Sequence, residues 1–233
     1  EGDHQTFYRD IVPDQNGDLI ITGSFAGTAD FDLQSGVNEI EASANGNSSF
    51  VQKLNSSGEL LWVAVFQPTD FSFARAVDVD SQGAVYAVGM FRDSLDIDPS
   101  ENEEWSVGFP NVPVQYVVKL SADGDLEWGF ATPLGVNNTV ADVEIDQDDN
   151  VYVTGQFSNQ IDFDPGPDEF LLPEDGEIPY EQSYLVKLNS DGEFLWARDI
   201  DSQPGGLNYG RSLSCNADNE IYLLGEFNGI FSP

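Results

Sequence analysis

Three pairs of aspartates recur along the chain, and one apolar residue separates the two members of each pair. The pairs are Asp30 and Asp32, Asp96 and Asp98, and Asp162 and Asp164. On a β-strand, residues i and i+2 point to the same face, so each pair would present two carboxylates together. Calcium takes about six to eight oxygen ligands, so loop carbonyls and water would have to complete each shell. We expect either a calcium ion at each pair or carboxylates that accept hydrogen bonds from the backbone or from a repeated lysine.

The cations form a second series, because the chain has 42 acidic residues and only 8 lysine and arginine residues. Six cations occupy positions that repeat along the chain: Lys53, Lys119, Lys187, Arg9, Arg75 and Arg211. This placement predicts one structural ion pair per repeat for each series. The arginines also alternate in phase with apolar residues, which are Ile11, Val77 and Leu213. One hypothesis is a partial ring of guanidinium groups that binds a carboxylate ligand at a channel mouth; the other is pairing with acids of the neighbouring repeat.

Tryptophans suggest a further contact. Trp62, Trp128 and Trp196 each follow a turn glycine at a repeated position, which is typical of core packing between repeats. Trp105 lies outside the repeat, in the acidic loop ENEEWSVGF. An aromatic side chain on a loop is a candidate for contact with a sugar or a protein partner.

Catalysis has little support in the sequence. His4 is the single histidine and lies near the N-terminus, so we expect neither a serine–histidine–aspartate nor a cysteine–histidine arrangement, and no zinc constellation exists. A hydrolase that uses two carboxylates remains an alternative because of the many acids, although no acid pair outside the repeat stands out.

The elements that must position these residues are β-hairpins. AVDVDSQGAVYAVGMF, at residues 76–91, reads as two apolar runs joined by a tight turn, and similar hairpins start near residues 11, 143 and 213. The glycine of the second run recurs at Gly23, Gly89, Gly155 and Gly225, with spacings of 66, 66 and 70 residues. The lysine series marks a third strand and the tryptophan series a fourth. The sequence therefore predicts a repeat of four antiparallel strands.

Radial packing into a β-propeller is the array that best protects short sheets of this kind. We expect an all-β fold of about three and a half blades, at residues 5–66, 72–132, 138–200 and 209–233, the last a half blade. Long loops are expected at residues 26–48, 92–113 and 158–182. Because about four to eight blades close a propeller, we expect further sequence or another chain to complete the array.

Composition limits the partners. A formal net charge of −34 leaves no basic patch for nucleic acid or for an anionic membrane surface. No run of about eighteen apolar residues is present, so membrane insertion is not expected. The acidic surface suits a salty or divalent-rich setting outside the cell.

The hairpin, the DFDPG element at Asp162 to Gly166 and the KLNSDGEFLW element at Lys187 to Trp196 resemble the bacterial β-propeller repeat called SBBP. The resemblance covers essentially the whole chain, although the first and second repeats have DFDLQSG and DIDPSEN in place of DFDPG. It implies a secreted or surface protein, of the kind found in marine and Bacteroidetes-type bacteria, without a shared catalytic apparatus.

The function predicted from the sequence is a non-catalytic extracellular binding or scaffold module that contacts a glycan or a protein through its long loops. Calcium is the one cofactor expected. The alternatives are a polysaccharide-active hydrolase and a structural subunit of an extracellular assembly.

Overall fold

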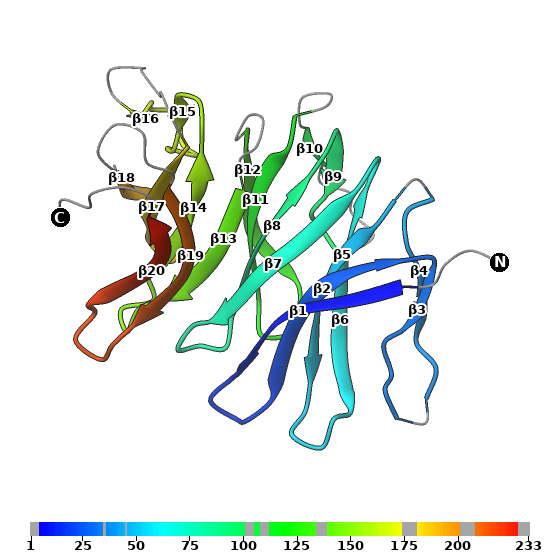
Figure 1. The fold of residues 1–233 in the computed structure, drawn as a ribbon. Helices are drawn as coiled ribbons and strands as arrows, with labels where there is room; N and C mark the ends of the chain where they lie inside the picture. Colours follow the sequence, from blue (N-terminus) through cyan, green and yellow to red (C-terminus); the bar gives the residue numbers. More distant parts are fainter. Residues whose placement is uncertain are drawn as a thin grey trace.

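The computed structural model describes residues 5–34, 36–44, 46–100, 105–107, 112–133, 139–173, 181–200 and 208–227. Regular structure within these residues is entirely β, with twenty strands and no helix, so no helix there has the length and hydrophobicity needed to span a membrane. Figure 1 shows the strands gathered into neighbouring sheets that follow one another in chain order, like the ribs of a fan. The expected all-β class is confirmed for the described residues.

Four antiparallel sets of strands make up the fan, and we call them sheets 1 to 4. Sheet 1 contains β1 (Gln5–Pro13), β2 (Leu19–Ala26), β5 (Ser48–Leu54) and β6 (Leu60–Pro68). Sheet 2 contains β7 (Ser72–Val79), β8 (Val85–Phe91), β11 (Val114–Leu120) and β12 (Leu126–Pro133). Sheet 3 contains β13 (Thr139–Ile145), β14 (Val151–Phe157), β17 (Gln182–Leu188) and β18 (Phe194–Ile200). Sheet 4 is the hairpin of β19 (Asn208–Cys215) and β20 (Ile221–Phe227).

The segments expected as long loops contain short hairpins, which corrects the sequence-based prediction. These are β3 (Thr28–Asp30) with β4 (Glu39–Glu41), β9 (Ser94–Asp96) with β10 (Trp105–Val107), and β15 (Ile161–Asp162) with β16 (Leu171–Leu172). β9 also pairs with β6, where Gln67 lies opposite Asp96. Sheet 1 is therefore six-stranded and not four-stranded, because a hairpin from the second repeat covers its outer edge.

An aspartate or asparagine organises the turn between the first two strands of each sheet. In sheet 2, Asp80 Oδ1 accepts hydrogen bonds from the backbone N–H groups of Gln82 and Ala84, both at 2.9 Å. Gly83 lies between them with a φ of +84°, a conformation that glycine adopts without steric cost. The equivalent residues accept the same pair of bonds in the other sheets: Asp14, Asp146 and Asn216.

A β-bulge interrupts the first strand of every sheet. In sheet 2, Ala74 pairs with Gly89 and Ala76 pairs with Val88, so Arg75 is the extra residue. The bulged residues of sheets 1, 3 and 4 are Arg9, Ala141 and Arg211. Because a bulge breaks the alternation of a strand, the predicted shared phase of arginines and apolar residues is wrong: Arg75 is exposed while Val77 is 1% exposed.

The sheets pack face to face, with first strands adjacent: β1 contacts β7, β7 contacts β13, and β13 contacts β19. An apolar side chain of a first strand is buried where a preceding sheet packs against that strand. Ile11 at the start of the fan is 54% exposed, whereas its equivalents Val77 and Val143 are 1% and 2% exposed. This face-to-face packing of antiparallel sheets agrees with the packing of blades in a propeller-like fold.

Candidate functional site

The aspartate pairs lie at the ends of the short hairpins, and their carboxylates bind the backbone. Asp162 Oδ1 accepts from the N–H groups of Asp164 (3.1 Å) and Phe170 (2.9 Å), and Asp164 Oδ1 accepts from Gly166 (2.7 Å). Asp30 with Asp32 and Asp96 with Asp98 make the corresponding bonds to the second residue after each aspartate. The residues between the two members of each pair are buried: Phe31, Ile97 and Phe163.

These contacts match the structural alternative stated for the pairs, in which they accept backbone hydrogen bonds. In the described part of the chain, no three acidic, histidine or cysteine side chains come close enough together to hold a metal ion. Calcium at the six aspartates stays a prediction.

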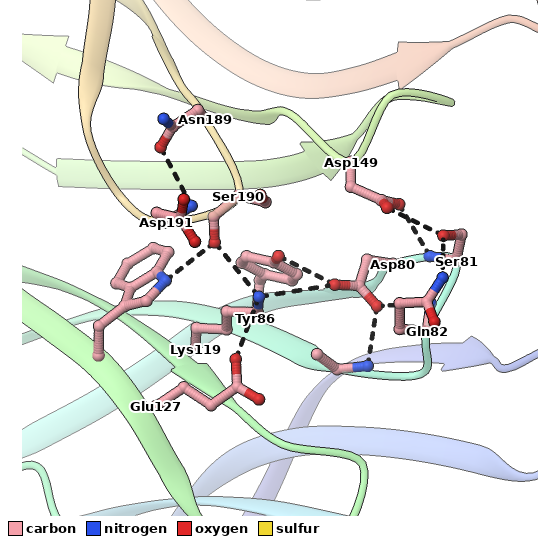
Figure 2. A network of polar contacts seen from close by, with 12 residues as sticks. Asp80, Ser81, Gln82, Tyr86, Lys119, Glu127, Asp149, Asn189, Ser190 and Asp191 are labelled. Carbon is pink, nitrogen blue, oxygen red and sulfur yellow. Dashed lines mark hydrogen bonds and ion pairs between the residues drawn. The ribbon is translucent and has the colours of Figure 1, made fainter.

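The repeated lysines form one largely buried ion pair in each of sheets 1 to 3. Figure 2 shows the pair of sheet 2, where Lys119 Nζ lies 3.8 Å from Asp80 and 3.1 Å from Glu127. Lys119 also donates to the backbone carbonyl of Ser190 in sheet 3, at 3.2 Å. The equivalent pairs are Lys53 with Asp14 (3.0 Å) and Lys187 with Asp146 (3.2 Å). The predicted structural ion pair therefore exists for the lysine series, and the lysine of sheet 2 also ties its sheet to the next.

The arginines differ from the lysines in their partners. Arg211 pairs with Glu226 of its own hairpin at 3.1 Å. Neither Arg9 nor Arg75 lies within 4.0 Å of a carboxylate of any described residue. Although Arg75 is open to solvent, the protein around it lowers the pKa of its guanidinium, and the positive charges of Arg9 and Arg211 lower that pKa further. The bulges thus bring like charges together, at an electrostatic cost.

Arg9 and Arg75 share a partly enclosed cavity of about 300 Å³. Its lining consists of Arg9, Phe71, Phe73, Arg75, Met90 and Pro113. The ring centroids of Phe71 and Phe73 lie 5.0 Å apart at an interplanar angle of 40°. The Arg92 guanidinium lies 4.5 Å from the centroid of the Phe71 ring and pairs with Asp70 at 3.5 Å. The cavity therefore combines two guanidinium groups that lack a carboxylate partner among the described residues with an aromatic and thioether wall.

A set of carboxylates on the first strands was missed by the sequence analysis. Each accepts a backbone N–H from the first strand of the next sheet: Asp10 from Val77 (3.0 Å), Asp78 from Ile145 (2.7 Å), Asp142 from Leu213 (2.7 Å) and Glu144 from Cys215 (2.8 Å). The sequence pattern that could have revealed these carboxylates is the alternation of acids with apolar residues along the first strands, as in Val77 to Asp80.

Burial raises the pKa of Asp78, Asp142 and Glu144 because it disfavours the charged form, and repulsion from neighbouring acids adds to the effect. The pKa of Asp78 rises to about 6, through burial and then the charges of Asp142 and Asp10. The pKa of Glu144 rises to about 7, through burial and then the charges of Asp78 and Asp142. Because their carboxylate oxygens accept backbone N–H groups of the next sheet, these hydrogen bonds join adjacent sheets.

Replacing Glu144 by glutamine should stabilise the chain at pH 8 by about 1 kcal/mol, a value that allows for solvent screening. A pKa raised by folding means that the contribution of this carboxyl is present below its unfolded pKa and is lost as the pH rises through about 7. Glutamine keeps the acceptor for the Cys215 N–H and removes the charge. The gain, measured by urea unfolding, should vanish at pH 4. Glu39→Gln, at an exposed glutamate, is the control and should change little at either pH; an equal gain at both pH values for Glu144→Gln would contradict the assignment.

Trp105 begins β10 and lies opposite Asp96, so it is on a strand and not in a loop. The structure describes the backbone of Trp105 but not its side chain, so its role as a contact for a sugar or a protein partner stays a prediction. Trp62 and Trp128 pack between sheets: Trp62 Nε1 donates to the carbonyl of Ala122 in sheet 2 at 2.9 Å, and Trp128 Nε1 donates to Ser190 in sheet 3 at 3.0 Å.

No protein-family model matches the chain. A WD repeat-containing protein of Acanthamoeba polyphaga mimivirus, described as uncharacterized, is 24% identical over 242 residues, which cover 95% of this chain. The chain spans only 17% of the length of that viral protein. A crystal structure of a protein of unknown function from Bacteroides caccae is 11% identical, and the match covers 83% of this chain and 82% of that one. The TM-score of this match is 0.29. WD repeats build β-propellers, so the viral relative agrees with the packing of the sheets seen here.

Proposed function

We propose that the chain is a non-catalytic interaction module of the propeller type, with three and a half blades, and that it binds a protein segment through the cavity between Arg9 and Arg75. The segment presents a carboxylate next to an aromatic or aliphatic side chain. The observation that carries the proposal is the absence of a carboxylate within 4.0 Å of either guanidinium among the described residues, in a chain with 42 acids.

Charge and shape both support this ligand class. Two guanidinium groups bind one carboxylate through charge-assisted hydrogen bonds, and an anion bound in the cavity would relieve the repulsion between Arg9 and Arg75. The wall of Phe71, Phe73 and Met90 suits an apolar group beside the carboxylate. A volume of about 300 Å³ is at the low end for ligand sites and fits one side chain.

The location of the protein, outside the cell or on its surface, is part of the same proposal. The resemblance to the SBBP repeat and the net charge of −34 support a secreted or cell-surface protein. The likeness to a WD repeat-containing protein supports a repeat array that acts by binding.

Two fluorescein-labelled peptides test the proposal: Gly-Ser-Gly-Ser-Phe with a free C-terminal carboxylate, and the same peptide with a C-terminal amide. Fluorescence polarisation should show at least tenfold tighter binding of the acid, although the net charge of the protein repels anions. Arg75→Ala should weaken binding of the acid at least tenfold. Arg211→Ala is the matched control and should leave it within twofold, because Arg211 does not line the cavity. Equal binding of acid and amide, or no effect of Arg75→Ala, would refute the proposal.

A further inference from the structure

The third strands of neighbouring sheets are linked by a tyrosine hydroxyl that points back to the preceding sheet. Tyr116 of sheet 2 donates to Ser49 Oγ of sheet 1 at 3.1 Å. Tyr184 of sheet 3 donates to Gln115 Oε1 of sheet 2. The tyrosines occupy equivalent positions, and so do their acceptors, so each sheet bonds to the one before it in the same way.

The fourth strands carry a second link in the opposite direction. Trp62 and Trp128 each reach forward to a carbonyl in the turn between the third and fourth strands of the next sheet. That turn fits the indole closely because it contains glycine: a Cβ on Gly124 would lie 2.8 Å from the Trp62 ring, and one on Gly192 would lie 3.1 Å from the Trp128 ring. The turn thus supplies a hydrogen-bond acceptor and a surface without a side chain.

Sheet 3 contains the equivalent acceptor residue and the equivalent tryptophan, but neither side chain has a hydrogen-bond partner among the described residues. Ser183, the equivalent of Ser49 and Gln115, is 0% exposed, and its Oγ has no hydrogen-bond partner there. Trp196, the equivalent of Trp62 and Trp128, packs on Tyr152 with 6.1 Å between ring centroids, but no acceptor for its Nε1 lies within the described residues. A buried polar atom without a partner costs about 1–3 kcal/mol, so the Ser183 hydroxyl points to a missing group.

Strands added to the β20 edge of sheet 4 would supply the missing hydrogen-bond partner. β2, β8 and β14 each pair with a third strand, whereas β20 pairs only with β19 in the described part of the chain. Ile221 and Leu223 on β20 are half-buried, while their equivalents in sheets 2 and 3, Val85, Ala87, Val151 and Val153, are at most 1% exposed. Figure 1 shows the β19–β20 hairpin at one end of the fan, beside sheet 3.

We infer that this surface binds a β-hairpin with the pattern of β17 and β18, which adds to β20 as the third and fourth strands of sheet 4. Its first strand carries a tyrosine whose hydroxyl donates to Ser183. Its glycine-containing turn offers a backbone carbonyl to Trp196 Nε1. Sheet 4 has Asn216 where the other sheets have an aspartate that pairs with lysine, so this hairpin does not need the repeated lysine. The inference is independent of the cavity at Arg9 and Arg75.

An extended chain tests the inference. The full chain is continued after Pro233 by a flexible linker of about twenty residues and a copy of residues 181–200, which contain β17, β18 and their turn. Hydrogen exchange is followed by NMR at the β20 amides and at the Trp196 indole, whose signal is identified by its loss in Trp196→Phe. Exchange at both places should slow at least tenfold relative to a chain extended with a scrambled copy.

Ser183→Ala separates the proposed bond from general stabilisation. In the unextended chain this change should leave the melting temperature unchanged or raise it, because it removes a hydroxyl that lacks a partner. In the extended chain it should lower the melting temperature by several degrees, unless the copied tyrosine equivalent to Tyr184 is replaced by phenylalanine. Equal exchange with the intact and the scrambled copy, or an equal effect of Ser183→Ala in both chains, would overturn the inference.

Discussion

Replacing Gly89 by alanine should lower the free energy of unfolding by about 3 kcal/mol or more. A Cβ at this position would lie 2.2 Å from the carbonyl oxygen of Phe73 and 2.5 Å from the Tyr116 ring and hydroxyl. The carbonyl belongs to the bulged strand and cannot rotate away as a side chain would, and Tyr116 is fully buried and bonded to Ser49. Relief of the collision therefore requires the bulge at Arg75 to flatten, which disrupts the core between sheets 1 and 2.

Gly17→Ala is the matched control for this prediction. Gly17 has a φ of +79°, but no atom lies within 4 Å of an added Cβ. The cost there is the left-handed backbone alone, about 1–2 kcal/mol. Urea unfolding followed by tryptophan fluorescence gives both values. If Gly89→Ala costs no more than Gly17→Ala, close packing against the bulge is not the reason for the repeated glycine.

The same bulge shows how far the sequence could predict the fold. The repeat length, the hairpins and the all-β class follow from local patterns, because apolar alternation and turn residues act over a few positions. The recurrence of Gly23, Gly89 and Gly155 was visible, but its reason was not. A bulge is a mismatch between two paired strands, so it appears only when their register is known. For the same reason, simple alternation placed Arg9 and Arg75 wrongly with the apolar residues of their strands.

The candidate site was predictable in its residues and not in its shape. Scarcity of cations drew attention to Arg9, Arg75 and Arg211, but the pattern did not show that Arg211 pairs with Glu226 of its own hairpin while Arg9 and Arg75 have no carboxylate partner among the described residues. Phe71, Phe73 and Met90 gave no separate signal, because aromatic and thioether residues on strands are usually core. Which of 42 acids meets each lysine was equally open, since Lys187 and Asp146 are 41 residues apart and meet only through strand pairing.

Replacing Asp146 by alanine should lower the free energy of unfolding by about 3–5 kcal/mol. The Asp146 side chain is fully buried and that of Lys187 is 17% exposed, so the change leaves an ammonium group without its counter-ion. It also removes the acceptor for the turn N–H groups of Asp148 and Asn150 and for the Tyr152 hydroxyl. Burial alone would raise the pKa of Asp146, but hydrogen bonds from Asn150 and Lys187 hold that pKa below its ordinary value. The contribution of this carboxylate is therefore present above pH 4 and is lost as the pH falls through its folded pKa.

Asp146→Asn separates the turn from the charge, because sheet 4 already uses Asn216 with the same two turn bonds, both at 3.0 Å. If the buried charge dominates, Asp146→Asn should lose most of the stability that Asp146→Ala loses, and adding Lys187→Met should recover a large part of it. If the turn dominates, Asp146→Asn alone should be nearly neutral and Lys187→Met should recover nothing. Asp70→Asn, which breaks the half-exposed pair of Asp70 with Arg92 at 3.5 Å, sets the scale for a surface pair at less than about 1 kcal/mol. We expect the first outcome, because Lys187 has no other carboxylate within 4.0 Å among the described residues, whereas an asparagine serves the turn equally well in sheet 4.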